Sequence, residues 1–142
     1  MSVYQHILAA VDLNAHSTKV LQHASALARV CDAEMTVLHV VNGGTSSDAD
    51  HVIATEDEDD NRRVGEAERQ LYALLEREAL TNGVQSMVTF GHPGIEIVRQ
   101  AERVNADLIV IGLRTGQGIS MLVGHTVHHV LTSDLCNVLL IR

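Results

Sequence analysis

The residues best suited to bind a charged ligand follow short apolar segments that resemble strands. Asp12 ends the segment HILAAVD, and Gly112 ends DLIVIG and begins a glycine-containing stretch that reaches Gly124, His125 and Thr126. A helix that begins near Gly124 would present unpaired N–H groups and the positive end of its dipole, which suit phosphate. Glycine also lets the backbone approach an anion closely. The combination predicts a phosphate site between Asp12 and the stretch from Gly112 to Thr126.

Simpler structural roles compete at each of these positions. Asp12 can cap a loop or a helix through its carboxylate. Gly112 and Gly124 can be ordinary turn residues. None of the residues is specific by itself, so the prediction depends on their position at the ends of several strands.

Metal binding and catalysis receive less support from the sequence. Among nine histidines, His125, His128 and His129 fall on one predicted helix, but a zinc site needs three or four convergent ligands. The position of His125 at a helix start favours a phosphate contact instead. Ser120, Ser133 and His129 form no recognisable triad, and neither a nucleophile elbow nor a P-loop is present. We therefore expect no metal site and no efficient enzyme.

Composition excludes several classes of partner. The net charge of −8 and the aromatic content of 2% provide neither a basic surface nor stacking platforms for a nucleic acid. Cys31 and Cys136 are far apart, which favours buried thiols in a reducing compartment. The chain contains no apolar run near the ~20 residues of a membrane span and no signal peptide at its start. We expect a cytoplasmic protein without a membrane anchor.

Apolar runs alternate with amphipathic segments over residues 1–142, which we interpret as a single α/β domain. Strands are predicted at residues 6–12, 34–41, 85–90, 107–112 and 137–142. Helices are predicted at residues 17–32, 61–81, 94–105 and 124–133, with Ser17 or Asn14 as the cap of the first. Residues 42–60, which end in the acidic run 56–60, are predicted to form a solvated loop. Helices between strands require parallel pairing, and nearly continuous Val, Ile and Leu indicates a doubly wound sheet covered on both faces. Ligands of such sheets bind beyond the carboxyl ends of the strands, where the strand order reverses.

Four segments resemble the universal stress protein family. These are HILAAVDLNAHS, TVLHVV, GHPGIEIVRQAERVNADLIVIG and VGHTVHHVLTSDLCNVLLIR, which together span nearly the whole chain. The resemblance implies a five-stranded parallel sheet in the order 3-2-1-4-5, with Asp12 and Gly112 on either side of the crevice. It also implies a homodimer formed through the last strand, which the apolar run from Val138 to Ile141 fits. A plain sheet edge explains this run equally well.

Many members of this family bind ATP, and the resemblance implies an adenine nucleotide, ATP or AMP, at the crevice. It places Asp12 near the ribose and Val40 at the adenine, and Gly124, His125 and Thr126 at the phosphates. The implied cofactor-binding set is Ala10, Asp12, Val40, Gly112, Arg114, Thr115, Gly116, Gly124, His125 and Thr126. Magnesium would be held by phosphate oxygens, with Asp12 or Thr126 reached through water. Any ATP hydrolysis would be slow.

The glycine loop departs from the family pattern. Thr115 stands in place of the second glycine, with Gly116 one position later, and Gly124 comes one residue early. His125 follows this glycine where the family has Ser or Thr. Because one branch of the family lacks these glycines and does not bind ATP, the alternative is a dimeric stress-response interaction protein without a nucleotide.

Overall fold

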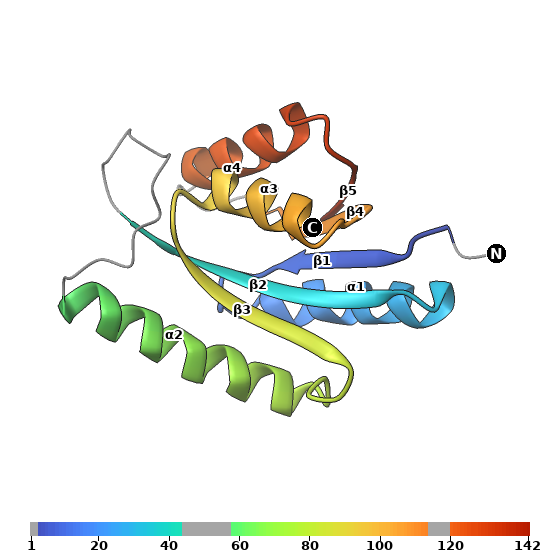
Figure 1. Ribbon diagram of the computed structural model, residues 1–142. Coiled ribbons are helices and arrows are strands. Elements are labelled where there is room, and N and C mark those ends of the chain that lie inside the picture. Colours follow the sequence, from blue (N-terminus) through green and yellow to red (C-terminus); the bar gives the residue numbers. More distant parts are fainter. Residues whose placement is uncertain (1–2, 44–57, 114–119) are drawn as a thin grey trace.

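A computed structural model describes residues 3–43, 58–113 and 120–142 of the chain, which form a parallel sheet between two layers of helices (Figure 1). The strands are β1 (His6–Ala10), β2 (Glu34–Asn42), β3 (Val84–Gly91), β4 (Leu108–Gly112) and β5 (Asn137–Ile141). The helices are α1 (Ser17–Cys31), α2 (Glu58–Arg77), α3 (Pro93–Arg103) and α4 (Ser120–Thr132). All strand pairs are parallel, in the order β3-β2-β1-β4-β5. The predicted doubly wound fold and its strand order are therefore confirmed.

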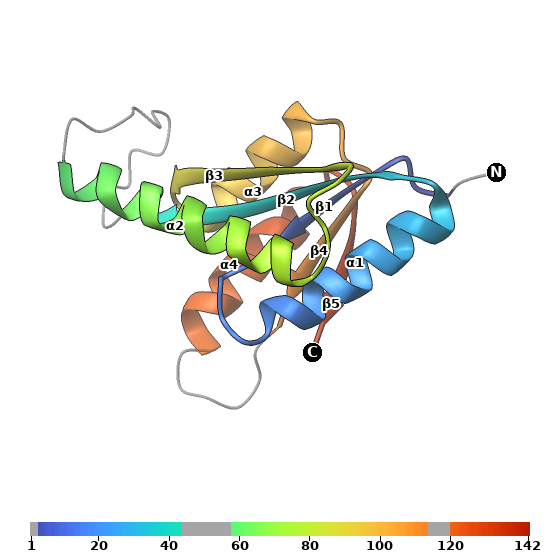
Figure 2. The same ribbon diagram turned by 90° about the horizontal axis from the view of Figure 1, so that it is seen from below.

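The central strand β1 is apolar after His6 because it is covered on both faces. Ile7 and Ala9 belong to the core beneath α1 and α2, whereas Leu8 and Ala10 belong to the core beneath α3 and α4. Figures 1 and 2 show these two pairs of helices on opposite faces of the sheet. This arrangement explains why the sequence of β1 does not alternate between apolar and polar residues.

The strand register brings the carboxyl ends of β1, β2 and β4 to one edge. Ala10, the last residue of β1, lies opposite Leu38 of β2 and Ile111 of β4. After β1 the chain enters α1 on one face, and α4 lies on the other face. The strand order thus reverses between β1 and β4, which is where doubly wound sheets leave a crevice.

The boundaries of β1 and α2 differ from the sequence prediction. Strand β1 ends at Ala10 rather than residue 12, although the Val11 N–H still donates to the Leu38 carbonyl at 2.9 Å. Helix α2 begins at Glu58, so the acidic residues 58–60 are its first turn, where the helix dipole favours negative charge. The same helix ends at Arg77, four residues before the predicted end, and Ala79 just beyond it has a left-handed φ of 57°.

Helix α4 begins at Ser120, and the predicted start at residue 124 is wrong. Glycine inside a helix costs only about 1 kcal/mol relative to alanine. The packing of Val127 and Val130 against the sheet, where both are buried, offsets that cost. Gly124 therefore lies within the helix rather than before it. None of the helices in the described part of the chain has the length and hydropathy that crossing a lipid bilayer requires.

Candidate functional site

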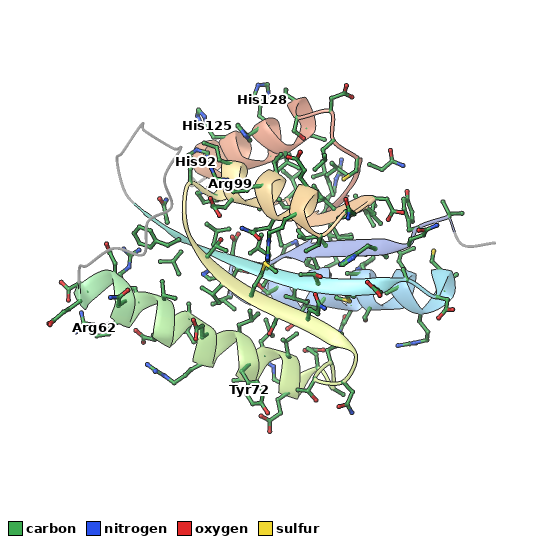
Figure 3. All side chains as sticks on the ribbon, viewed as in Figure 1. Arg62, Tyr72, His92, Arg99, His125 and His128 are labelled. Atoms are coloured by element: carbon green, nitrogen blue, oxygen red, sulfur yellow. The ribbon has the colours of Figure 1, made fainter. Side chains whose placement is uncertain are left out.

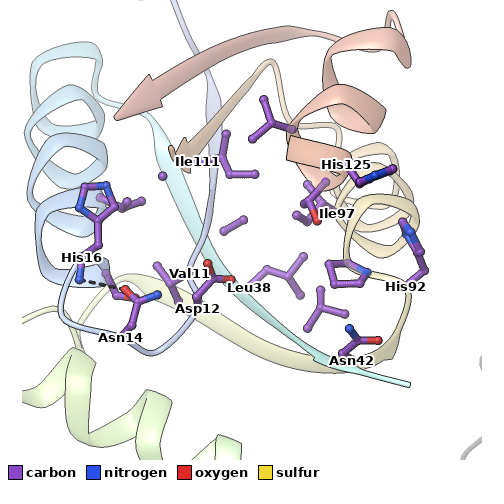
Figure 4. Close-up of a pocket in the computed structure, with 18 residues that line it drawn as sticks. Val11, Asp12, Asn14, His16, Leu38, Asn42, His92, Ile97, Ile111 and His125 are labelled. Carbon is purple, nitrogen blue, oxygen red and sulfur yellow. Dashed lines mark hydrogen bonds between the residues drawn. The ribbon is translucent and has the colours of Figure 1, made fainter. Parts of the chain in front are cut away.

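A cavity of about 400 Å³ opens at the carboxyl edge of the sheet, between the start of α1 on one side and α3 and α4 on the other (Figure 4). This volume lies in the range of small-molecule sites, about 300–1,000 Å³. Apolar side chains cover the part nearest the sheet, namely Ala10, Leu38, Val40, Ile97 and Ile111. Polar groups surround them, so the site can hold a ligand with one apolar and one polar end.

Six of the ten predicted site residues line this cavity: Ala10, Asp12, Val40, Gly112, His125 and Thr126. Gly124 is not among the lining residues. Arg114, Thr115 and Gly116 lie outside the described residues, as does most of the predicted loop at residues 42–60.

Gly112 is glycine because α1 passes very close to the end of β4. A Cβ atom at this position would lie 2.7 Å from His16 Cδ2 and 3.1 Å from Val20 Cγ2. The first distance is below any normal carbon–carbon contact, so a larger residue would displace His16. Packing between α1 and β4 therefore accounts for Gly112, and no ligand is needed to explain it.

His16 joins the cavity to the end of β5. Its Nε2 lies 2.9 Å from the Ile141 carbonyl oxygen, and the Leu113 N–H donates to the same oxygen at 2.7 Å. A carbonyl only accepts hydrogen bonds, so Nε2 carries a proton and donates. The His16 N–H in turn donates to Asn14 Oδ1 at 2.9 Å, which orders the loop between β1 and α1 (Figure 4). A single histidine before a helix gave no sequence signal for this role.

Ser17 is a second lining residue that sequence reasoning assigned only to helix capping. It is 2% exposed, and its Oγ has no hydrogen-bond partner among the described residues. Leaving a buried hydroxyl unpaired costs about 1–3 kcal/mol. A polar ligand atom in the cavity, or a water molecule, would remove this cost.

The opposite wall is formed by the first turn of α3 and the second turn of α4. His92 precedes Pro93 as the N-cap of α3, and its Nδ1 accepts a hydrogen bond from the Ile95 N–H at 3.3 Å. His125 has an exposed side chain and lies on the same side of the cavity as His92 in two views (Figures 3 and 4). Gly94 allows the two helices to approach, because a Cβ there would lie 2.8 Å from His129 Cβ. Within the described ranges, no three His, Cys, Asp or Glu side chains converge as a metal site would require.

Gly124 differs from Gly112 in its surroundings. It is the fifth residue of α4, and no atom of the described residues lies within 4 Å of a Cβ built on it. Only the first four N–H groups of a helix, counted from its N-cap, lack an intrahelical partner, so the free N–H groups within α4 belong to residues 120–122. The predicted role of Gly124 as the helix start therefore passes to residues earlier in the chain.

Charge around the cavity is unevenly distributed. Asp12 is exposed at the rim, where it also borders a second hollow of about 270 Å³ with His39, Arg63 and Glu66. Among the described residues that line the main cavity, the groups that can carry positive charge are three histidines, with no lysine or arginine.

Comparison with known proteins gives a consistent result. The family model described as "Universal stress protein family" matches residues 3–142. Universal stress protein YxiE of Bacillus subtilis is 32% identical over 149 residues, covering 99% of this chain and 100% of the relative. Universal stress protein A homolog 2 of Coxiella burnetii is 28% identical over 143 residues, covering 100% of this chain and 97% of the relative.

Solved structures with this fold include proteins with bound nucleotides. Universal stress protein UspA from Lactobacillus plantarum has a TM-score of 0.76 and 24% identity, with 100% of both chains covered. A universal stress protein in complex with cAMP has a TM-score of 0.64, 18% identity and coverage of 99% and 98%. The Archaeoglobus fulgidus protein in complex with dAMP has a TM-score of 0.65, 22% identity and 99% coverage of both chains. Together with the sequence match over nearly its whole length, these results show that the chain belongs to the universal stress protein family.

Proposed function

We propose that this stress-response protein binds an adenine nucleotide, ATP or AMP, in the cavity between β1 and β4. The observation that carries the proposal is the convergence of Asp12, Val40, Gly112, His125 and Thr126 around one cavity at the switch point of the sheet. Two structures that share the fold have cAMP and dAMP bound, which adds support.

The proposed orientation follows from the lining. The adenine lies against the apolar side chains Leu38, Val40 and Ile97, which are covered by the sheet and α3. The Asp12 carboxylate is an acceptor suited to ribose hydroxyl groups, and the unpaired Ser17 hydroxyl offers a further contact. Apolar contact then provides affinity, and these few polar groups provide orientation.

The phosphates extend toward the segment between Gly112 and Thr126 in this proposal. The free N–H groups at the start of α4 would serve the role first predicted for Gly124. Magnesium would be held by phosphate oxygens, with Asp12 or Thr126 contacting it through water.

We further propose that two copies associate through β5 in the cytoplasm. Strand β5 is the last strand of the sheet order, and its residues 138–140 are half-buried within one chain. Pairing with a second β5 would satisfy its outer N–H and C=O groups. The two cysteines are free thiols, which suits a reducing compartment, but both are half-buried rather than buried as predicted.

A dimeric interaction protein without a nucleotide is the second candidate. The position of Gly124 within α4, rather than at its start, is the observation that favours it. The two candidates differ in whether the cavity binds a nucleotide.

Calorimetric titration of the folded protein with ATP and magnesium distinguishes the two candidates. Binding with a Kd below about 0.5 mM supports the nucleotide proposal, whereas no heat at that concentration contradicts it. Nucleotide released from the purified protein by acid and identified by mass would support it independently.

Variants at Gly124 and Ser17 test the proposed orientation. Gly124→Asp places a negative charge near the phosphates and should weaken ATP binding at least about tenfold more than the isosteric Gly124→Asn. Ser17→Ala should weaken the binding of ATP and adenosine alike by about tenfold, because both would lose the same hydroxyl contact. Equal affinities for the Asp and Asn variants would show that the phosphates do not lie near Gly124.

A further inference from the structure

We infer that the cavity binds phosphate-bearing ligands together with a proton, which histidines in its wall take up. This inference rests on the proposed nucleotide site and describes how pH would regulate it. Three histidines, His16, His92 and His125, line the cavity. The described lining includes one carboxylate, Asp12, and no lysine or arginine.

Three other cationic side chains that the structure describes near this end of the protein already have partners. Arg63 donates to the Asn42 carbonyl at 3.0 Å and contacts Asp60, on the side of the second hollow. Lys19 donates to the Arg142 carbonyl at 2.6 Å. Arg99 forms an ion pair with Glu96 at 2.7 Å. Among the described residues, positive charge for a phosphate would therefore come from imidazole, a group that ordinarily changes charge between pH 5 and 8.

Of the three histidines, His92 is the least suited to take up the proton. Its Nδ1 accepts the hydrogen bond from the Ile95 N–H, and protonation of that nitrogen would remove the acceptor. The ring also lies at the start of α3, where the positive end of the helix dipole disfavours a cation. His92 is therefore the least favourable of the three for an added proton, and its other ring nitrogen can donate a hydrogen bond.

His16 can be protonated without losing its own hydrogen bond. Nε2 donates to the Ile141 carbonyl in both charge states, so the added proton would go to Nδ1. Its half-buried position at the start of α1 opposes the charge through desolvation and the helix dipole. His16 is the second candidate.

His125 meets the fewest obstacles. Its side chain is exposed, and it immediately precedes the cavity residue Thr126. The titratable groups on the elements around it are His92 and the Glu96–Arg99 pair on α3, His128 and His129 on α4, and Asp12 across the cavity. Of these, the Glu96–Arg99 ion pair has no net charge. A bound phosphate would be the anion that favours the protonated form of His125.

The linkage has a defined sign. Because the complex holds more protons than the free protein, affinity falls as pH rises. Uptake of one proton gives a limiting change of about tenfold per pH unit, so we expect a weakening of at least about fivefold between pH 6 and 8. A ligand without phosphate should show no such change.

The test is calorimetric titration with cAMP, AMP and adenosine between pH 5.5 and 8, repeated in two buffers of different ionisation enthalpy. The cyclic phosphodiester has no ionisation in this range, whereas the second pKa of a phosphate monoester is near 6. The buffer dependence of the heat therefore measures the protons taken up by the protein when cAMP binds. This measurement requires no variant, so it stands even if a substitution prevents folding.

Matched variants then locate the proton. His125→Gln should remove most of the pH dependence of cAMP affinity. His128→Gln on the exposed face of the same helix should retain it. His16→Gln introduces an amide that can still donate to the Ile141 carbonyl. It should remove the smaller part of the pH dependence of cAMP affinity.

Binding of cAMP or AMP with a pH-independent affinity and no proton uptake would overturn the inference and leave the nucleotide proposal intact. Loss of that binding in Arg114→Gln would then assign the charge to Arg114. Absence of binding by all three ligands at every pH would refute the nucleotide proposal and the inference together.

Discussion

Replacement of Gly112 by alanine tests the close contact between α1 and β4. The added Cβ would lie 2.7 Å from His16 Cδ2 and 3.1 Å from Val20 Cγ2. The ring must move, and its hydrogen bond to the Ile141 carbonyl, at 2.9 Å, would be lost or lengthened. Overpacking of a core typically costs about 1–3 kcal/mol and a lost hydrogen bond about 1 kcal/mol, so we expect Gly112→Ala to lower the free energy of unfolding by about 2–4 kcal/mol.

Urea unfolding followed by far-UV circular dichroism measures this change, since the chain has no tryptophan for fluorescence. Gly124→Ala is the matched control, because no atom of the described residues lies within 4 Å of its Cβ. In the interior of a helix this control should raise the free energy of unfolding by up to about 1 kcal/mol. The two Gly→Ala changes are therefore expected to have opposite signs.

A double-mutant cycle with His16→Ala assigns the cause. Removing the ring makes room for the new methyl group, so the cost of Gly112→Ala should fall below about 1 kcal/mol in that background. If the cost is the same in both backgrounds within about 0.5 kcal/mol, His16 is not the obstacle, and the packing explanation for Gly112 is wrong.

Three further predictions concern the Cys136 thiol and the contacts of Asp107 and Arg99. Burial and, secondarily, the Asp107 carboxylate raise the pKa of the Cys136 thiol, against a backbone hydrogen bond that lowers it. The thiolate fraction of Cys136 at pH 8 is then reduced. Iodoacetamide should therefore alkylate Cys136 more slowly than it alkylates the thiol of free glutathione, with both rates measured by mass spectrometry. Asp107→Ala removes the acceptor of the N–H groups of residues 5 and 6, at 2.8 and 3.0 Å, and should cost about 1.5–3 kcal/mol in urea unfolding. Arg99→Ala removes the ion partner of Glu96, which is 1% exposed, and should lower the free energy of unfolding by about 1–3 kcal/mol. The control Arg103→Ala removes a hydrogen bond to the neutral amide of Gln100 and should lower it by less.

The convergence of the site residues could be predicted because it depends on strand ends alone. Parallel strands that follow one another through helices present their carboxyl ends at one edge, whatever their exact length. Asp12 follows β1, Gly112 ends β4 and Val40 lies two residues before the end of β2, so an error of two residues at the end of β1 did not separate them. The strand order itself came from the family resemblance, since local sequence patterns carry no information about which strands pair.

The start of α4 could not be predicted for an energetic reason. Glycine was interpreted as a boundary, but a penalty of about 1 kcal/mol is small beside the burial of Val127 and Val130 against the sheet. Tertiary packing therefore decided the boundary. This is why Gly124 lies in the fifth position of the helix rather than before it.

His16 and Ser17 could not be identified because their roles depend on distant residues. Both precede or begin α1, where Ser and polar residues are expected for capping alone. The contact of His16 with Gly112 and Ile141 joins segments about 100 residues apart. The missing partner of the Ser17 hydroxyl becomes evident only when the packing around it is known.

The fold accounts for the cavity without specifying its ligand. A sheet whose order reverses between β1 and β4 sends neighbouring helices to opposite faces, so a hollow forms at that edge in any chain with this topology. The ligand class must then be argued from the side chains that line it. An apolar ligand would leave the Ser17 hydroxyl unpaired and bring Asp12 no partner, whereas a nucleoside offers hydroxyl groups to both. The imidazoles on the opposite wall add positive charge only when protonated, which favours a ligand whose own phosphate stabilises that charge.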